Sequence, residues 1–279
     1  ATAIAVGCTV VYKPSEKSPI GLLQLGDLVR EAGFPPGVIN ILSGGGKTGA
    51  MLASHMNINK ISFTGSLLTG KKIQEAAAQS GQACVAASRV FVHENIASTF
   101  IEQLKARFEQ ISQAIGSPLD PRIVFGPLAD TIQFKRVMSF LEIGKQEAEL
   151  ITGGQRHGYS KNGLYVEPTI FLNPKDDARI YREEIFGPVL AIRTFKTEEE
   201  AVQLANDTTF GLSACIYTAS TSRALRIAKQ IDAGNVNINS SQTFHIAAPF
   251  GGYKQSGLGR EGGRQGLMRL VEAKTISIK

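Results

Sequence analysis

Cys84 lies in a run of small residues and is the best candidate for a nucleophile in this chain. Its neighbours Gly81, Ala83 and Ala86 leave room for a substrate beside the thiol and allow backbone N–H groups to approach the sulfur. A thiolate in such a setting attacks carbonyl carbon, and nearby N–H groups stabilise the resulting oxyanion. The alternative is a buried structural thiol, because free cysteine is often a small core residue. The local sequence leaves both interpretations open.

Two further pairs of residues have side chains suited to the hydroxyl groups of a sugar. Lys13 and Glu16 end a short apolar stretch, and an amine beside a carboxylate holds two neighbouring hydroxyls. Glu184 and Phe186 offer a second carboxylate with an aromatic wall. The alternatives are a solvated turn for the first pair and a surface acid before a strand for the second.

Glycines stand where helices are expected to begin, and these positions favour phosphate. A helix N-terminus offers free N–H groups and a partial positive charge, and the Ser66 hydroxyl adds a donor. The glycines concerned are Gly44, Gly45, Gly46, Gly65 and Gly70. Because none of them belongs to a G-x-G-x-x-G fingerprint or a Walker loop, plain connecting turns are an equal alternative.

The candidate residues of the first part of the chain follow predicted strands. Apolar stretches predict strands at residues 9–12, 38–42 and 60–63. Helices are expected between them, including one through residues 22–29 and one over 68–78. This alternation predicts an α/β fold with a parallel, doubly wound sheet, in which ligands bind at the carboxyl ends of the strands.

The sequence beyond Cys84 predicts a second α/β unit. Apolar residues have helical spacing over 100–111 and 132–141. Strands are expected at residues 89–92, 166–170, 189–195, 215–217, 235–238 and 275–278. We therefore predict two domains: a partial nucleotide-binding unit over residues 1–80, and a cysteine-bearing unit with a C-terminal strand over residues 81–279.

Composition narrows the function classes. The chain has 279 residues and a net charge of +6 without aromatics interleaved among the basic residues, which disfavours a nucleic-acid surface. It has no membrane-length apolar run and no signal peptide at its start. Cys8 and Cys215 are expected to be core residues, and the spacing of the three cysteines favours a reducing, cytoplasmic location. The four histidines share no ligand spacing, so no metal is expected.

Together these motifs resemble the NAD(P)-dependent aldehyde dehydrogenases. The segment 13–16 is similar to the family's K-P-S-E turn and 63–66 to its F-T-G-S turn. Cys84 ends a G-Q-x-C motif, residues 183–188 read E-E-I-F-G-P, and residues 249–254 read P-F-G-G-Y-K. The five motifs occur in the family's order, and the similarity covers essentially the whole chain.

The resemblance implies a role for each site residue. Cys84 would be the nucleophile that attacks an aldehyde, and Phe250 would line the substrate pocket. The remaining residues would bind NAD or NADP: Lys13, Ser15 and Glu16 at the adenosine ribose, Gly46, Gly65 and Ser66 along the adenosine and pyrophosphate, and Glu184 and Phe186 at the nicotinamide riboside. The family also implies a homo-oligomer, with the C-terminal strand pairing between subunits.

The chain departs from the family pattern in two places. The family's N-terminal portion, which supplies the first strand of the nucleotide sheet, an oxyanion-hole asparagine and an oligomerisation hairpin, has no counterpart here. The segment between F-T-G-S and G-Q-x-C is also absent, and no E-L-G-G occurs anywhere in the sequence. By resemblance that segment carries a sheet strand and the glutamate that activates water for release of the acyl group.

Three functions follow as alternatives. The first is an aldehyde dehydrogenase that oxidises an aldehyde to an acid through a cysteine thiohemiacetal, with redox turnover weakened by the absent general base. The second is a repurposed non-redox enzyme that cleaves a thioester or ester or cyclises a metabolite. The third is a catalytically dead binding protein. Formation of NAD(P)H supports the first, turnover without cofactor supports the second, and a stable fold with neither supports the third.

Overall fold

The computed structural model describes residues 2–55, 57–58, 82–120, 123, 125–241, 245–272 and 274–278. The chain divides into two compact units. Unit 1 comprises Ala1–Ser66, Thr243–Gly251 and Leu258–Lys279, and unit 2 comprises Leu67–Gln242 and Gly252–Gly257. The division at residue 80 stays a prediction, because residues 59–81 lie outside the described part of the chain.

Unit 1 contains a short parallel pair of strands with helices between and after them. Strands β1 (Val10–Tyr12) and β2 (Ile39–Ile41) pair in parallel, with Val10 opposite Ile39. The helices of this unit are α1 (Thr2–Ala5), α2 (Ile20–Leu23), α3 (Leu25–Glu31), α4 (Gly46–Ser54) and α11 (Gly263–Met268). The expected helix through residues 22–29 is thus two short helices that meet at Gln24. The expected strand at 60–63 and helix at 68–78 lie outside the described residues.

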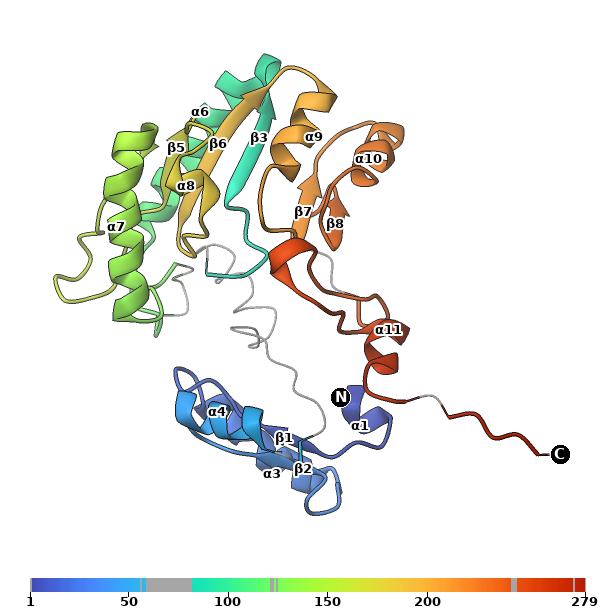
Figure 1. Cartoon of the computed structure of the whole chain (residues 1–279). Coiled ribbons are helices and arrows are strands. Elements are labelled where there is room, and N and C mark those ends of the chain that lie inside the picture. The colour runs from blue at the N-terminus through green and yellow to red at the C-terminus, as the bar shows by residue number, and fades with distance from the viewer. Residues whose placement is uncertain are drawn as a thin grey trace. The chain divides into compact units, whose positions relative to one another are not determined.

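Unit 2 is built on a four-stranded sheet in the order β3-β6-β5-β4 (Figure 1). Its strands are β3 (Arg89–His93), β4 (Glu149–Thr152), β5 (Thr169–Leu172) and β6 (Val189–Phe195). The pairs β3–β6 and β5–β6 are parallel, whereas β4 joins β5 antiparallel at the edge. The parallel strands are joined through helices, as the sequence predicts.

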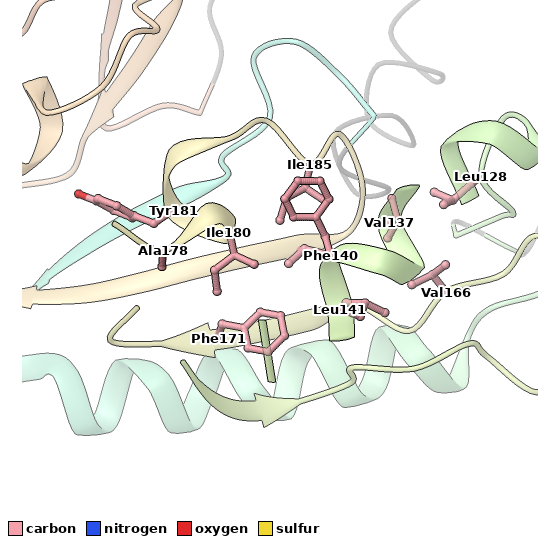
Figure 2. Close-up of a cluster of buried hydrophobic side chains, with 11 residues drawn as sticks. Leu128, Val137, Phe140, Leu141, Val166, Phe171, Ala178, Ile180, Tyr181 and Ile185 are labelled. Atoms are coloured by element: carbon pink, nitrogen blue, oxygen red, sulfur yellow. The ribbon is translucent and has the colours of Figure 1, made fainter. Parts of the chain in front are cut away.

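Helices cover both faces of this sheet. They are α6 (Glu94–Gln113), α7 (Thr131–Glu147), α8 (Arg179–Arg182) and α9 (Glu198–Asn206). Successive residues of a strand point to opposite faces. Ile170 accordingly joins a core with residues of α6, and Phe171 joins a second core with residues of α7 and α8. Figure 2 shows Phe140 and Leu141 of α7 in this second core, with Phe171 from the sheet.

The helix ends of unit 2 follow local sequence rules. Asp130 caps α7, because its Oδ1 accepts hydrogen bonds from the N–H groups of Ile132 and Gln133, both at 2.9 Å. Thr197 caps α9 in the same way through the N–H of Glu200. At the C-terminal end of α9 the Arg89 guanidinium donates to the carbonyl of Ala205 at 3.0 Å. A cation at this end of a helix interacts favourably with the helix dipole.

A second, smaller sheet completes unit 2. Strands β7 (Ser213–Ile216) and β8 (Asn235–Ile238) are parallel and are joined through α10 (Thr221–Ala228). The short helix η1 (Lys254–Ser256) lies beside this sheet, since the Tyr253 N–H donates to the Gly211 carbonyl at 2.7 Å and the Gly211 N–H donates to Ser256 Oγ at 2.9 Å. The middle of the glycine-rich loop therefore belongs to unit 2.

Two expectations from the sequence are corrected here. Residues 275–278 form no strand, because a strand needs a hydrogen-bonded neighbour and the described residues provide none; Ile276 and Ile278 are exposed. Cys215 is exposed rather than a core residue, because β7 belongs to a sheet of two strands and, among the described residues, has β8 as its one neighbouring strand. Within the described residues, no helix has the length and apolar character needed to cross a bilayer.

Candidate functional site

Cys84 lies in a turn directly before β3. The Ala86 N–H donates to the Ala83 carbonyl at 2.9 Å, which closes the chain around the cysteine. The thiol is half-buried. Burial raises the pKa of Cys84 and the charge of Glu184 raises it further, while the N–H groups of Cys84 and Val85 hydrogen-bond toward the sulfur and lower it. Because burial is the largest of these effects, the pKa of Cys84 is raised and the resting group is a thiol.

Gln82 connects the cysteine turn to the start of α7. Its Oε1 accepts a hydrogen bond from the Ala129 N–H at 3.1 Å, and Ala129 directly precedes the capping residue Asp130. The glutamine of the G-Q-x-C motif thus has a structural partner 47 residues along the chain. Gly81 of the same motif lies outside the described residues.

The segment 183–188 presents Glu184 and Phe186 between buried neighbours. Ile185 is buried in the core, Glu184 is exposed, and Phe186 is half-buried. Phe186 has a φ of 58°, a left-handed conformation uncommon for a bulky residue. Gly187 is required here, because a Cβ on it would lie 2.5 Å from Val137 Cγ2.

Side chains of α7 hold this segment by its backbone. Gln133 Nε2 donates to the carbonyls of Ile185 and Phe186 at 2.8 and 2.9 Å, and Arg136 Nη2 donates to the Glu184 carbonyl at 2.7 Å. The Glu183 carboxylate has its own partners: the Arg179 Nε at 2.7 Å and the Arg136 Nη2 at 3.8 Å. Hydrogen bonding from Arg179 lowers the pKa of Glu183, so this acid is held as a carboxylate.

Unit 1 brings Lys13, Ser15, Glu16 and Gly46 together around the start of α4. Lys13 Nζ lies 3.6 Å from Glu16 Oε2 and donates to the carbonyls of Pro14 and Gly44, both at 2.8 Å. A hydrogen bond from its own backbone lowers the pKa of Glu16, and Lys13 lowers it further. Ser15 Oγ accepts from the Lys17 N–H at 3.3 Å, and Gly46 is the first residue of α4.

Of three other predicted site residues, the structure describes only Phe250. Gly65 and Ser66 lie outside the described residues, so their predicted role stays a prediction. Phe250 is half-buried in unit 1, where its N–H and carbonyl exchange hydrogen bonds of 2.7 Å with Glu261. Cys84, Glu184 and Phe186 belong to unit 2.

Sequence reasoning assigned no role to Gln133 or Arg136. Both side chains donate to backbone carbonyls. Every residue has a backbone carbonyl, so the residue type does not reveal which carbonyl accepts such a hydrogen bond. The usable signal was indirect: Gln133 occupies the third position after the helix cap Asp130, on the first turn of a strongly predicted helix. A position on a helix indicates the direction in which its side chain extends. It does not identify the hydrogen-bond partners of that side chain.

The fold and site define an α/β protein with a candidate cysteine nucleophile in one unit and a lysine–glutamate pair at a glycine-rich helix start in the other. The family model described as "Aldehyde dehydrogenase family" matches residues 1–80 and 76–276. The chain belongs to this family, as its motifs indicate.

Curated relatives and solved structures agree with this assignment. The chain is 40% identical over 317 residues to an aldehyde dehydrogenase of Davidiella tassiana, covering 99% of this chain and 63% of that protein. It is 40% identical over 319 residues to human retinal dehydrogenase 2, covering 100% of this chain and 61% of that protein. The chain therefore spans less than two thirds of the length of these relatives.

The structural likeness is close. A point mutant of betaine aldehyde dehydrogenase from Staphylococcus aureus, solved in complex with NAD+, superposes with a TM-score of 0.89 at 33% identity, covering 98% of this chain and 64% of that one. An NAD-dependent aldehyde dehydrogenase from Sinorhizobium meliloti gives a TM-score of 0.85 at 37% identity, covering 95% and 60%. These matches confirm the predicted α/β, aldehyde-dehydrogenase-like fold.

The comparisons also locate an interruption. The family model matches in two pieces that meet at residues 76–80, and the alignment to the Davidiella tassiana protein runs over 317 positions although this chain has 279 residues. That relative therefore carries residues that have no counterpart in this chain. The interruption falls where the sequence lacks the segment between F-T-G-S and G-Q-x-C.

Proposed function

We propose that this chain captures an aldehyde on Cys84 and oxidises it with NAD or NADP, and that it releases the acyl group slowly. The observation that carries the proposal is the half-buried Cys84 thiol in a turn that the Ala86 N–H closes by donating to the Ala83 carbonyl. Membership of the aldehyde dehydrogenase family supports the reaction class.

The bond-forming part of the capture step uses Cys84 and its backbone neighbours, all of which belong to unit 2. The Cys84 thiol gives its proton to water, and the thiolate then attacks the carbonyl carbon of the aldehyde. A carbon–sulfur bond forms as the carbonyl π bond breaks, and the oxygen becomes an oxyanion that takes up a proton as a thiohemiacetal. The backbone N–H groups of Cys84 and Val85, whose hydrogen bonding lowers the pKa of the thiol, are proposed to stabilise charge at this centre.

NAD or NADP, held by the residues named below, would supply the oxidation as a hydride acceptor. The thiohemiacetal on Cys84 would give up a hydride from its carbon and a proton from its hydroxyl, which leaves a thioester on Cys84. Water then cleaves the thioester to give the acid and the free thiol. Family members use a glutamate to activate this water, and the segment that carries it by resemblance is absent from the sequence. A lost general base slows such a step by about 10²–10⁴-fold, so we expect the thioester to persist.

The described residues of unit 1 fit the adenosine part of such a cofactor. Lys13 and Glu16 are 3.6 Å apart and so offer a donor and an acceptor to the two hydroxyls of one ribose. Gly45 and Gly46 begin α4 with open space where a Cβ would stand, which suits a close-lying pyrophosphate. Glu16 favours an unphosphorylated ribose and thus NAD, because a carboxylate repels a phosphate.

Glu184 and Phe186 are proposed to position the nicotinamide riboside, and Phe250 to line the substrate pocket. Glu184 is exposed, and its charge raises the pKa of Cys84 after burial as the larger cause. Gly65 and Ser66 keep their proposed place along the pyrophosphate. We also propose that the chain forms a homo-oligomer in the cytoplasm, because unit 1 exposes large apolar side chains such as Ile20, Leu28 and Met51.

The interruption near residues 76–80 favours a second candidate, cleavage of a thioester or ester without redox chemistry. Attack by the Cys84 thiolate on an activated acyl group needs neither a cofactor nor unit 1. Both candidates share the acyl adduct and differ in the need for NAD(P). A protein that binds ligand without forming an adduct would instead be a catalytically dead binding protein.

The test is a stopped-flow and intact-mass experiment on the purified chain. With a small activated ester we expect a burst of one product equivalent, followed by slow turnover, and one acyl adduct by mass. The matched variants are Cys84→Ala, Cys8→Ala and Cys215→Ala, of which only the first should lose the burst. An adduct that survives in Cys84→Ala would contradict the proposal. Adding an aldehyde with NAD or NADP and measuring the reduced cofactor then separates the two candidates.

A further inference from the structure

We propose that Gln133 is a positioning residue that keeps the segment 184–186 in a fixed place relative to the cysteine turn. This inference rests on the proposed function only in so far as Cys84 is the reactive thiol. Gln133 touches no reacting atom in the proposed chemistry. Its amide group instead donates to two consecutive backbone carbonyls, those of Ile185 and Phe186, at 2.8 and 2.9 Å.

The conformation of the segment explains why such a holder is needed. Phe186 has a φ of 58°, and a non-glycine residue in a sparsely populated conformation costs about 1–3 kcal/mol unless its surroundings impose it. The two donated hydrogen bonds reach the peptide before Phe186, through the Ile185 carbonyl, and the peptide after it, through the Phe186 carbonyl. The Arg136 guanidinium adds a third, to the Glu184 carbonyl at 2.7 Å. Three consecutive carbonyls are therefore held from one helix, α7.

The same end of α7 also holds the cysteine turn. The Ala129 N–H donates to Gln82 Oε1 at 3.1 Å, and Gln82 stands two residues before Cys84. Asp130 then fixes the first turn of the helix through the N–H of Gln133 at 2.9 Å. Two segments about 100 residues apart in sequence are thus tied to one rigid helix end, by Gln82 on one side and by Gln133 on the other.

The charges around this arrangement give the positioning a measurable effect. Glu183 faces Arg179 and Arg136, and its carboxylate is paired with both. The neighbouring Glu184 is the carboxylate whose charge raises the pKa of Cys84, after burial as the larger cause. If Gln133 releases the segment, Glu184 gains distance and water reaches the thiol more easily. Both changes lower the pKa of Cys84 and raise its thiolate fraction at neutral pH.

The test variant is Gln133→Met, which keeps the length and the helix preference of the side chain but cannot donate. The rate of Cys84 alkylation by iodoacetamide is measured against pH by peptide mass mapping. We expect the pH midpoint to fall by about half a unit, which is roughly a threefold faster reaction at neutral pH. Cys215 in the same samples is the internal reference, and its profile should not change.

The matched control is Gln155→Met, because Gln155 Nε2 also donates one side-chain hydrogen bond, to Glu167 Oε1 at 3.2 Å, away from the cysteine turn. It should leave the Cys84 midpoint unchanged. Should Gln133→Met fail to fold, Gln133→Leu takes its place. A double-mutant cycle with Glu184→Gln gives the decisive result: Gln133→Met should shift the midpoint less when the Glu184 charge is already gone.

Two outcomes would overturn the inference: an unchanged Cys84 midpoint in folded Gln133→Met, or an equal shift in Gln155→Met. Fully additive shifts of the Cys84 midpoint in the double-mutant cycle would show that Gln133 does not act on Cys84 through Glu184. Alkylation requires neither substrate nor cofactor, so these outcomes are independent of whether an acyl adduct forms. Failure of the proposed function and failure of the positioning role are therefore distinguishable.

Discussion

The two units differ most in how their residues are packed. Unit 2 has a sheet with cores on both faces, and Leu141, Ile170 and Phe171 are fully buried in them. Among the described residues of unit 1, the buried ones are Pro14 and Gly266, and neither has a large apolar side chain. The residues proposed for cysteine chemistry stand on the well-packed unit, and the residues proposed for the adenosine ribose stand on the other.

This difference has a consequence for function. A site holds its geometry when the elements beneath it are locked by packing. The cysteine turn and the segment 184–186 are tied to α7, whose inner face lies in a core (Figure 2). The Lys13–Glu16 pair is supported by backbone carbonyls and by a two-stranded sheet. We therefore expect capture chemistry at Cys84 to be more robust than cofactor binding.

The largest expected effect is the loss of activity in Cys84→Ala, which tests whether the chemistry takes place at the thiol of unit 2. Cys84→Ala should lose the acyl burst completely and reduce turnover of an activated ester by about 10³-fold or more, because the variant lacks the proposed nucleophile. Stopped-flow absorbance and intact mass measure both quantities. Turnover that persists in this variant would take the thiol out of the mechanism and leave a repurposed pocket as the better account.

The difference in packing between the two units can be tested directly with one substitution in each unit. Leu141→Ala in unit 2 should lower the free energy of unfolding by about 2–5 kcal/mol, because it opens a cavity in a closed core. Leu28→Ala in unit 1 is the matched change, in a helix but with the side chain 59% exposed, and should cost at most about 0.5 kcal/mol. Urea titrations followed by circular dichroism give both values. Equal costs would remove the contrast between the units.

Cofactor binding tests unit 1 by itself. NAD affinity should be weak, and Glu16→Gln should lower it by a further factor of about ten, since a hydrogen bond to a charged group contributes about 1.5–3 kcal/mol. Asp27→Asn is the control, because Asp27 forms a comparable ion pair with Arg30 at 2.9 Å in the same unit. Calorimetry on the full chain gives the affinities. Tight binding would show that unit 1 needs no larger core to hold a nucleotide.

The smallest expected effect is electrostatic and lies within unit 2. Burial and the Glu184 charge both raise the pKa of Cys84, so its alkylation should rise with pH later than that of a free cysteine, near 8.5. Glu184→Gln removes the second cause and should move the midpoint down by a fraction of a pH unit, still above the free thiol. Glu183→Gln should not move it, because the Glu183 charge is paired with arginines.

Local sequence was enough for much of unit 2. The apolar run at residues 189–195 predicts the strand β6, and the structure buries Val189 and Leu190 in opposite cores. The helical spacing of apolar residues over 132–141 predicts α7. Lys13 and Glu16 could be paired from sequence too, because they are three residues apart and meet across a single turn. In each case the signal and its consequence lie within a few residues.

Tertiary structure decided what depends on residues far apart. Only the fold places Gln133 under the carbonyls of Ile185 and Phe186, 52 and 53 residues away, and brings the Glu184 charge to Cys84. The exposure of Cys215 likewise depends on which strands pair with β7. The apolar pattern of β7 predicts a strand but does not identify its neighbours. Sequence therefore determined the family, many of the described elements and the candidate nucleophile. Burial, backbone hydrogen bonding and electrostatic coupling at that nucleophile were decided by the fold, because they arise between segments that no local pattern connects.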